Sequence, residues 1–195
     1  MRVKEGNKEK DILEGAINVF AKEGYHGAKI SKIAEVAGVA TGSVYVYFEN
    51  KEDILLKIFE QLWKQLYEEL LSLSDKSIFS PTEKIDAMID LAFDVFTSNP
   101  ALADVFVNEQ HHIQRSNKTQ FTNYYEKFLG LGEEFIRQGI QKKIIHGSID
   151  VKILRYFILG AIRNLLQSWL NDPKTFSLNK IRQNVKYLVK YGIQK

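Results

Sequence analysis

The sequence predicts an all-α protein of about nine helices, for three reasons. Apolar residues recur at spacings of three and four along most of the chain, which is the period of an amphipathic helix. The alternation of apolar and polar residues that predicts strands is absent. The three prolines, Pro81, Pro100 and Pro173, stand where a helix begins or has just ended.

The N-terminal part predicts three short helices. A helix with an apolar face over residues 12–20 ends at Gly24, because glycine readily adopts the left-handed conformation of a C-cap. A second helix, over residues 30–37, is closed by Gly38. Thr41 then caps a third helix of about two turns.

Longer helices follow. Asn50 caps a fourth helix, with Asp53 as its capping-box partner and an apolar stripe that continues to Leu70. A linker over residues 72–80 leads to a fifth helix, which begins with Ser80-Pro81-Thr82-Glu83, a second capping box.

Apolar spacing and capping residues also predict the remaining helices. A short helix starts at Pro100 and a long one, over residues 121–143, follows it. The helix over residues 150–171 is apolar nearly all round, so we expect it to be buried. Ser177 caps the last helix. On the fifth helix, an acidic stripe opposite the apolar face is expected to be solvated: Asp86, Asp90 and Asp94.

The composition excludes several classes of protein. The chain has 195 residues, enough for a hydrophobic core, and no cysteine, so disulfides and thiolate-bound metals are excluded. No apolar run approaches the roughly 20 residues that span a bilayer, and the charged N-terminus lacks the apolar segment of a signal peptide. We therefore expect a cytoplasmic protein that does not enter a membrane.

Charge is distributed unevenly along the chain. Residues 1–53 contain eight Lys and Arg against nine Asp and Glu, whereas residues 114–195 contain fifteen against five. A DNA-binding role of the N-terminal part would therefore depend on the local placement of cations and not on a basic excess. The basic excess of the C-terminal part favours an anionic ligand there.

The second and third predicted helices form a helix-turn-helix unit, in which the second helix enters the major groove of DNA. Gly38 supplies the positive φ of the turn, and Val44 and Phe48, four residues apart, face inward. Five residues of the third helix are left to face outward: Thr41, Gly42, Ser43, Tyr45 and Tyr47.

These outward residues suit contacts with DNA. Hydroxyl groups bond phosphates or base edges, and Gly42 allows close approach of the backbone. Lys51 adds a cation at the start of the fourth helix, where free N–H groups and the helix dipole favour a phosphate. The competing interpretation is that Tyr45 and Tyr47 pack under the fourth helix.

The segment GYHGAKISKIAEVAGVATGSVYVYFENKEDIL resembles the N-terminal domain of the TetR family of transcriptional repressors, and the match covers roughly residues 8–55. The resemblance implies that Ser31 and Lys32 contact DNA, as do the outward residues of the third helix and Lys51. Lys29 departs from the family pattern, which often has a capping Thr or Ser there, and could contact a phosphate instead. Tyr47 stands where His is common.

The basic residues near the N-terminus have two interpretations. They add phosphate contacts from an arm, or they form an ordinary solvated terminus: Arg2, Lys4, Lys8 and Lys10.

The resemblance also implies a homodimer that binds a palindromic double-stranded DNA operator. The last two helices of each subunit would form a four-helix bundle, and they carry more apolar surface than one small bundle needs to bury internally. We expect a DNA-binding domain over residues 1–53 and an effector-binding and dimerisation domain over residues 54–195. Beyond a small-molecule effector, no cofactor is expected.

Three features of the C-terminal part bear on the effector. Aromatic residues crowd its middle helices, although ordinary core packing accounts for most of them. A polar stripe runs along the helix over residues 150–171. A glycine inside a helix lowers helix stability by about 1 kcal/mol relative to alanine, so its presence favours close helix contact or space for a ligand. Four glycines stand inside the predicted helices of this part: Gly130, Gly132, Gly139 and Gly160.

The candidate ligand-binding residues come from the aromatic group and the polar stripe: Phe93, Phe96, Phe106, Tyr125, Phe128, Tyr156, Gly160, Arg163, Asn164 and Gln167. A buried Arg163 would need a partner, either a carboxylate such as Glu109 or Glu133 or an anionic ligand. The basic excess favours an anion, and a ligand with a long apolar tail and phosphates suits this combination.

A closer resemblance points the same way. The NKEDIL segment, the G.IDV pattern of residues 147–151 and Trp169 are similar to the TetR-type regulators of fatty-acid degradation in Bacillus and its relatives. Those regulators sense long-chain acyl-CoA, so the resemblance implies a repressor of fatty-acid metabolism genes that acyl-CoA releases.

The sequence also allows functions of other classes. A sensor of another hydrophobic or cationic molecule, as in multidrug efflux control, would need buried carboxylates, which Asp94, Glu109 and Glu133 could supply. A protein partner could also replace the ligand. No sequence motif of an enzyme is present, and the adjacent pair His111-His112 points in directions about 100° apart on a helix, so no metal site is expected.

Overall fold

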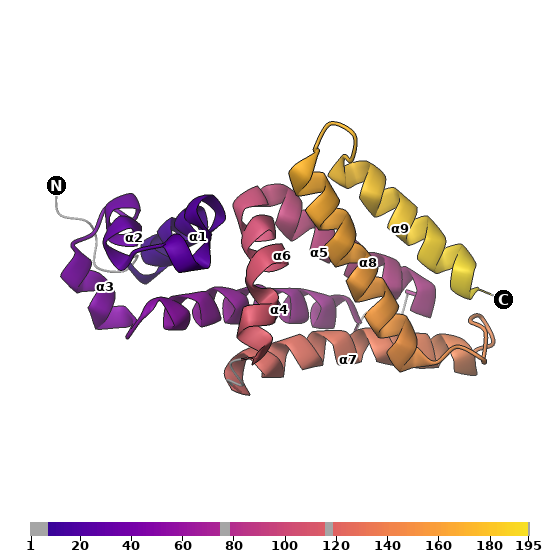
Figure 1. Ribbon diagram of the computed structural model, residues 1–195. Coiled ribbons are helices and arrows are strands. Elements are labelled where there is room, and N and C mark those ends of the chain that lie inside the picture. The colour runs from indigo at the N-terminus through magenta and orange to yellow at the C-terminus, as the bar shows by residue number, and fades with distance from the viewer. Residues whose placement is uncertain (1–7, 75–78, 116–118, 195) are drawn as a thin grey trace. The chain divides into compact units, whose positions relative to one another are not determined.

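A computed structural model describes residues 8–74, 79–115 and 119–194, and the side chains of these residues apart from 111–122 (Figure 1). Arg2 and Lys4 of the predicted arm, and the side chains of His111 and His112, lie outside the described part. The described residues form nine helices: α1 (Lys8–Gly27), α2 (Ile30–Val36), α3 (Thr41–Tyr47), α4 (Lys51–Ser74), α5 (Pro81–Ser98), α6 (Pro100–Arg115), α7 (Thr119–Gln141), α8 (Val151–Asn171) and α9 (Leu178–Ile193).

This architecture confirms the predicted all-α class. Within the described ranges the only pairing of extended backbone is an isolated antiparallel bridge between Ile145 and Gln194. No helix in those ranges is both long and apolar enough to cross a membrane.

The predicted helix starts are found at three places. Asn50 accepts the N–H groups of Glu52 and Asp53 at 2.9 and 3.0 Å. Ser80 forms the complete capping box with Glu83, and Ser177 accepts the N–H of Lys180. Hydrogen bonds of this kind satisfy N–H groups that the helix itself leaves free, so they locate its first residue.

The other predicted helix boundaries differ from the structure in three places. Thr41 is the first residue of α3 and caps nothing, because Ala40 occupies the N-cap position without a side-chain bond. The helical backbone is interrupted at Gly24 as predicted, with a φ of 69°, but a further turn carries α1 to Gly27. The helix from Pro100 has 16 residues and is therefore not short.

The chain divides into two compact units, while the expected functional domains, residues 1–53 and 54–195, stay a prediction. One unit contains residues 1–62 together with 100–121, and the other contains residues 63–99 and 122–195. The α6 helix belongs to the first unit because it packs against α1.

In the first unit, α1 and α2 approach closely at Gly15. A Cβ atom at this position would lie 3.0 Å from the backbone nitrogen of Ala37 and 3.2 Å from the carbonyl oxygen of Ile33. Neither atom can move without shifting the backbone of α2 or the residue that follows it. Glycine therefore allows the two helices to pack.

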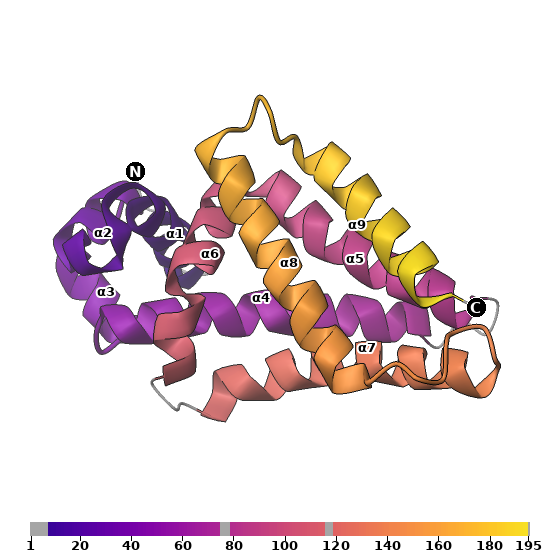
Figure 2. The ribbon, with the colours of Figure 1, turned by 45° about the vertical axis from the view of Figure 1, so that its right-hand side comes forward.

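In the second unit, α9 lies along α5 (Figure 2). Asp90 pairs with Lys186 at 2.6 Å and with Arg182 at 3.8 Å, and Arg182 also contacts Asp94. Asp90 thus belongs to an ion-paired contact between two helices, so the expectation of a solvated stripe was wrong for Asp90, whereas the side chain of Asp94 is 63% exposed. The sequence could not show this, because the basic partners lie about 90 residues away.

The α8 helix was expected to be buried, and the structure corrects this. Leu166 is its only buried residue, whereas the side chains of Ile153, Tyr156 and Phe157 are about 70% exposed. The helix packs on α9 and leaves a second apolar side uncovered by this chain.

Candidate functional site

The α2 and α3 helices meet at a turn that has the predicted form. Gly38 adopts a φ of 67°, which favours glycine, and the N–H of Val39 donates to Ala34 at 3.0 Å. Val44 is fully buried and Phe48 is 5% exposed, as expected for the inward side of α3. These contacts fix the direction in which the rest of α3 points.

The other side of α3 is open to solvent. Tyr45 is 57% exposed and Tyr47 is 39% exposed, so the alternative in which they pack under α4 does not hold in this structure. Thr41 and Gly42 are also exposed, and Ser43 is half-buried. This placement leaves hydroxyl groups free to meet a surface outside the chain.

The predicted DNA-contacting residues on and before α2 differ in how accessible they are to a ligand. Ser31 is exposed, and Lys29 is an exposed N-cap residue that makes no capping bond. The Nζ atom of Lys32 donates to Glu35 at 2.7 Å, and this hydrogen bond raises the pKa of Lys32. A phosphate would therefore have to compete with Glu35 for that cation.

The Lys51 side chain, predicted to contact a phosphate, is directed toward the end of α1 in this structure. Its Nζ atom donates to three carbonyl oxygens at the end of α1, those of Tyr25 at 2.7 Å, His26 at 3.0 Å and Ala28 at 3.3 Å. It also lies 4.7 Å from the centroid of the Tyr25 ring. Because an ammonium group has three donors, the structure makes Lys51 a C-cap of α1.

The same end of α1 also contacts α6. The backbone N–H of Tyr25 donates to Oε1 of Glu109 at 3.4 Å, and its ring packs against Phe20 with centroids 5.6 Å apart. Burial is the largest cause of a raised pKa for Tyr25, and the charges of Glu52 and Glu109 add to it. The C-terminal end of α1 is therefore held by side chains of both α4 and α6.

Part of the predicted effector site forms an aromatic cluster in the second unit. The ring of Trp63 on α4 packs against Tyr125 and Phe128 of α7, with centroids 4.9 and 5.6 Å apart. Next to it, Lys127 lies over the rings of Tyr67 and Tyr124. Of this aromatic cluster, the prediction included Tyr125 and Phe128.

The other candidate ligand-binding residues differ in their surroundings. Phe96 is buried, Phe93 is buried beneath the guanidinium of Arg182, and Phe106 packs against Phe59 in the first unit. On α8, Tyr156, Gly160 and Asn164 are exposed, and Arg163 and Gln167 are half-buried.

The four helical glycines are of two kinds. At Gly132 a Cβ atom would lie 2.7 Å from Sδ of Met88, and at Gly139 it would overlap the side chain of Ile145. Close packing therefore favours glycine at Gly139, whereas the overlapped atoms at Gly132 belong to the flexible end of Met88, which can move. At Gly130 and Gly160 a Cβ atom would meet nothing within 4 Å.

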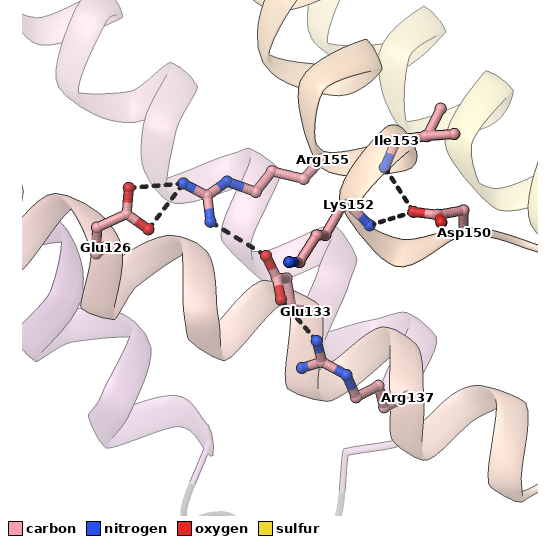
Figure 3. A network of polar contacts seen from close by, with 7 residues as sticks. All are labelled: Glu126, Glu133, Arg137, Asp150, Lys152, Ile153 and Arg155. Atoms are coloured by element: carbon pink, nitrogen blue, oxygen red, sulfur yellow. Dashed lines mark hydrogen bonds and ion pairs between the residues drawn. The ribbon is translucent and has the colours of Figure 1, made fainter.

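A polar network joins α8 to α7 (Figure 3). Nη2 of Arg155 donates to both carboxylate oxygens of Glu126 at 2.7 and 2.8 Å, and Nη1 donates to Glu133 at 3.1 Å. Glu133 also accepts from Arg137 at 2.7 Å. The Arg155 guanidinium lies 5.9 Å from the centroid of the Tyr125 ring, so the network borders the aromatic cluster.

Burial and pairing act in opposite directions within this network. Burial alone would raise the pKa of Glu133, but hydrogen bonds from Arg155 and Arg137 outweigh it and leave the pKa below its ordinary value. The Nε–H of Arg155 is buried and has no acceptor among the described residues. Arg155 thus keeps one unused donor beside the aromatic cluster.

Sequence reasoning missed Trp63 and Arg155 as site residues. Trp63 continues the 3.6-residue spacing of Phe59 and Leu66, which was available as a signal. Arg155 stands one residue before Tyr156, the first residue of the predicted polar stripe, and is not part of that stripe. Its side chain faces α7, which the sequence could not show because the orientation of α8 about its own axis was unknown. In the described side chains, no group of three or more His, Asp or Glu residues could hold a metal ion.

Comparison with known proteins places this architecture in a family. Residues 12–58 match the model for bacterial regulatory proteins of the tetR family, and residues 59–192 match the model for the C-terminal region of YsiA-like proteins. The fatty acid metabolism regulator protein of Bacillus subtilis is 30% identical over 182 residues, which are 93% of each chain.

Two solved structures share the fold over nearly the whole length. The regulator FadR of Bacillus subtilis in complex with stearoyl-CoA superposes with a TM-score of 0.82 at 28% identity, covering 95% of this chain and 99% of that one. The fatty acid degradation regulator FadR of Bacillus halodurans gives 0.81 at 27% identity, covering 95% and 96%. The chain therefore belongs to the TetR family of bacterial transcriptional regulators.

Proposed function

We propose that the protein is a repressor that binds a palindromic operator as a homodimer and is released by long-chain acyl-CoA. The observation that carries this proposal is the likeness, over 95% of the chain, to a regulator in complex with stearoyl-CoA. The controlled genes would be those of fatty-acid metabolism, as the name of the Bacillus subtilis relative suggests.

Features of this chain support an effector that is both apolar and anionic. Trp63, Tyr125 and Phe128 provide apolar surface, and Arg155 next to them keeps a buried donor without an acceptor in the described part of the chain. Residues 114–195 carry fifteen basic against five acidic side chains. An acyl chain and phosphates would use these two kinds of surface.

A cationic effector has less support. Glu133 is held by Arg155 and Arg137, and Asp94 contacts Arg182, so both carboxylates already have cationic partners. A cationic ligand would have to displace an arginine from each of them, which weakens the attraction that such a ligand needs.

The dimer would form through α8 and α9. The exposed apolar side chains on these helices are Ile153, Tyr156, Phe157, Tyr187, Leu188 and Tyr191, each more than 60% exposed. Large apolar side chains exposed in this number on two neighbouring helices favour an interaction site there. Release would work by population shift, because a ligand that binds better to a dimer with altered spacing of its reading helices disfavours the operator-bound state.

Fluorescence anisotropy of a labelled duplex from the palindrome upstream of the gene, at fixed salt, tests this function. Long-chain acyl-CoA should release the protein, and the effect should strengthen with chain length and be absent with free CoA or with cationic dyes. Tight binding that no acyl-CoA weakens would disprove the proposed effector and leave the DNA-binding role intact.

A further inference from the structure

The reading helix α3 has an unusual composition for a segment that enters the major groove. Its seven residues, TGSVYVY, include no Arg, Lys, Asn, Gln, Asp or Glu. Those are the side chains that distinguish bases by paired or charged hydrogen bonds with their edges. Whatever base recognition α3 provides must come from hydroxyl groups and from apolar contact.

Val46 is the most exposed large apolar side chain of α3, at 78%. It lies two residues after the buried Val44, which places it roughly 160° away, near the centre of the outward side. Gly42 lies one turn before it on the same side and has no side chain to cover it. Tyr45 and Tyr47 flank Val46 and are less exposed.

We propose that Val46 recognises the 5-methyl group of a thymine in each half-site of the operator. This inference rests on the proposed function, since it needs operator binding. The thymine methyl is the one apolar group that a base pair presents in the major groove, and a valine side chain offers only apolar contact. Valine is also stiff at χ1, so little side-chain freedom is lost when it docks.

Deoxyuridine provides the test, because it lacks the methyl group and pairs as thymine does. The operator is first selected from a random duplex pool with the full-length protein. Each thymine of a half-site is then replaced by deoxyuridine, in both half-sites at once. At one position the wild type should lose affinity by about fourfold per half-site, which is the effect of one buried methyl group.

Val46→Ala removes the methyl groups that would make this contact. The variant should bind the thymine operator more weakly than the wild type and should not discriminate between thymine and deoxyuridine at that position. Val36→Ala is the matched control, because Val36 on α2 is also exposed, at 46%, and its variant should keep the wild-type discrimination. Circular dichroism checks that both variants are folded.

The other outcomes contradict the inference in distinguishable ways. If the wild type binds the operator tightly but tolerates every deoxyuridine, no methyl group is read, while the repressor function stands. If Val46→Ala keeps the discrimination, another residue reads the methyl group. If the full-length protein selects no operator at all, the proposed function fails together with this inference.

Discussion

Arg155 on α8 and Glu133 on α7 form an ion pair in which both side chains are largely buried, at 16% and 11% exposure, with 3.1 Å between Nη1 and Oε1. The pair holds the inner side of α8 against α7. The residues next to Arg155 on the other side, Tyr156 and Phe157, are about 70% exposed. One arginine thus fixes the rotation of the helix that would form the dimer interface.

Loss of Arg155 should destabilise the protein. Arg155→Met leaves Glu133 buried with Arg137 as its remaining partner, so the free energy of unfolding should fall by about 2 kcal/mol. Glu126→Gln is the control, because Glu126 is 47% exposed and its pair should contribute less than about 1 kcal/mol. Urea unfolding at one protein concentration measures both variants. An equal loss of unfolding free energy in the two variants would contradict the view that the buried Arg155–Glu133 pair contributes more than the exposed Arg155–Glu126 pair.

Glu133 and Asp86 should respond to pH in opposite directions. Glu133 has a lowered pKa, so its ionised form stabilises the fold above the ordinary pKa, and this contribution is lost as pH falls through the folded-state value. Burial raises the pKa of Asp86 despite Lys186 and Lys190, so its ionised form opposes folding at neutral pH.

Replacing each carboxylate by its neutral amide tests whether Glu133 and Asp86 change stability with pH in opposite directions. Relative to the wild type, Glu133→Gln should be less stable near pH 7, and the difference should shrink as pH falls below the ordinary Glu pKa of about 4.3 and through the lower folded-state pKa of Glu133. The stability of Asp86→Asn relative to the wild type should instead increase as pH rises. Thermal unfolding at a series of pH values gives both curves, and curves of the same sign would show that one assignment is wrong.

Lys51 has two candidate roles, a phosphate contact predicted from the sequence and the capping of α1 seen in the structure. If Lys51 contacts a phosphate, Lys51→Met should reduce the slope of log affinity against log salt by about one per subunit. Because its ammonium instead caps the carbonyl oxygens of Tyr25, His26 and Ala28, we expect an unchanged slope, lower thermal stability and weaker operator binding. Salt titration of operator binding decides between the two roles.

Tyr47 should contribute to operator binding through its hydroxyl group. Tyr47→Phe should weaken binding by about tenfold, as expected for one hydrogen bond to a charged phosphate, and Tyr47→Ala should abolish it. Neither change should unfold the protein, because the side chain is 39% exposed. Tyr67→Phe, a half-buried tyrosine outside the first unit, should bind as the wild type does. Unchanged affinity of Tyr47→Ala would remove this residue from the interface.

Local chemistry was predictable and long-range pairing was not. Asn50 and Ser80 were assigned as caps because a cap and the N–H groups it accepts lie within three residues. The direction of Lys51 depends on carbonyl groups about 25 residues away, which no spacing rule reveals. For α8, the pattern showed an apolar surface on most sides but could not show whether this chain or a second copy covers it.

The exposed apolar side chains of α8 and α9 are expected to form the dimer interface. Phe157→Glu and Leu188→Glu each place a charge on a side chain about 70% exposed in one chain, so both variants should fold. In a dimer that charge would be buried, which would disfavour association and yield monomers. Operator affinity should then fall steeply, because a monomer has one helix-turn-helix and can contact only one of the two half-sites. Leu71→Glu, on an exposed position of α4, should remain dimeric in sedimentation and should bind as before. A dimeric Phe157→Glu protein would place the interface elsewhere.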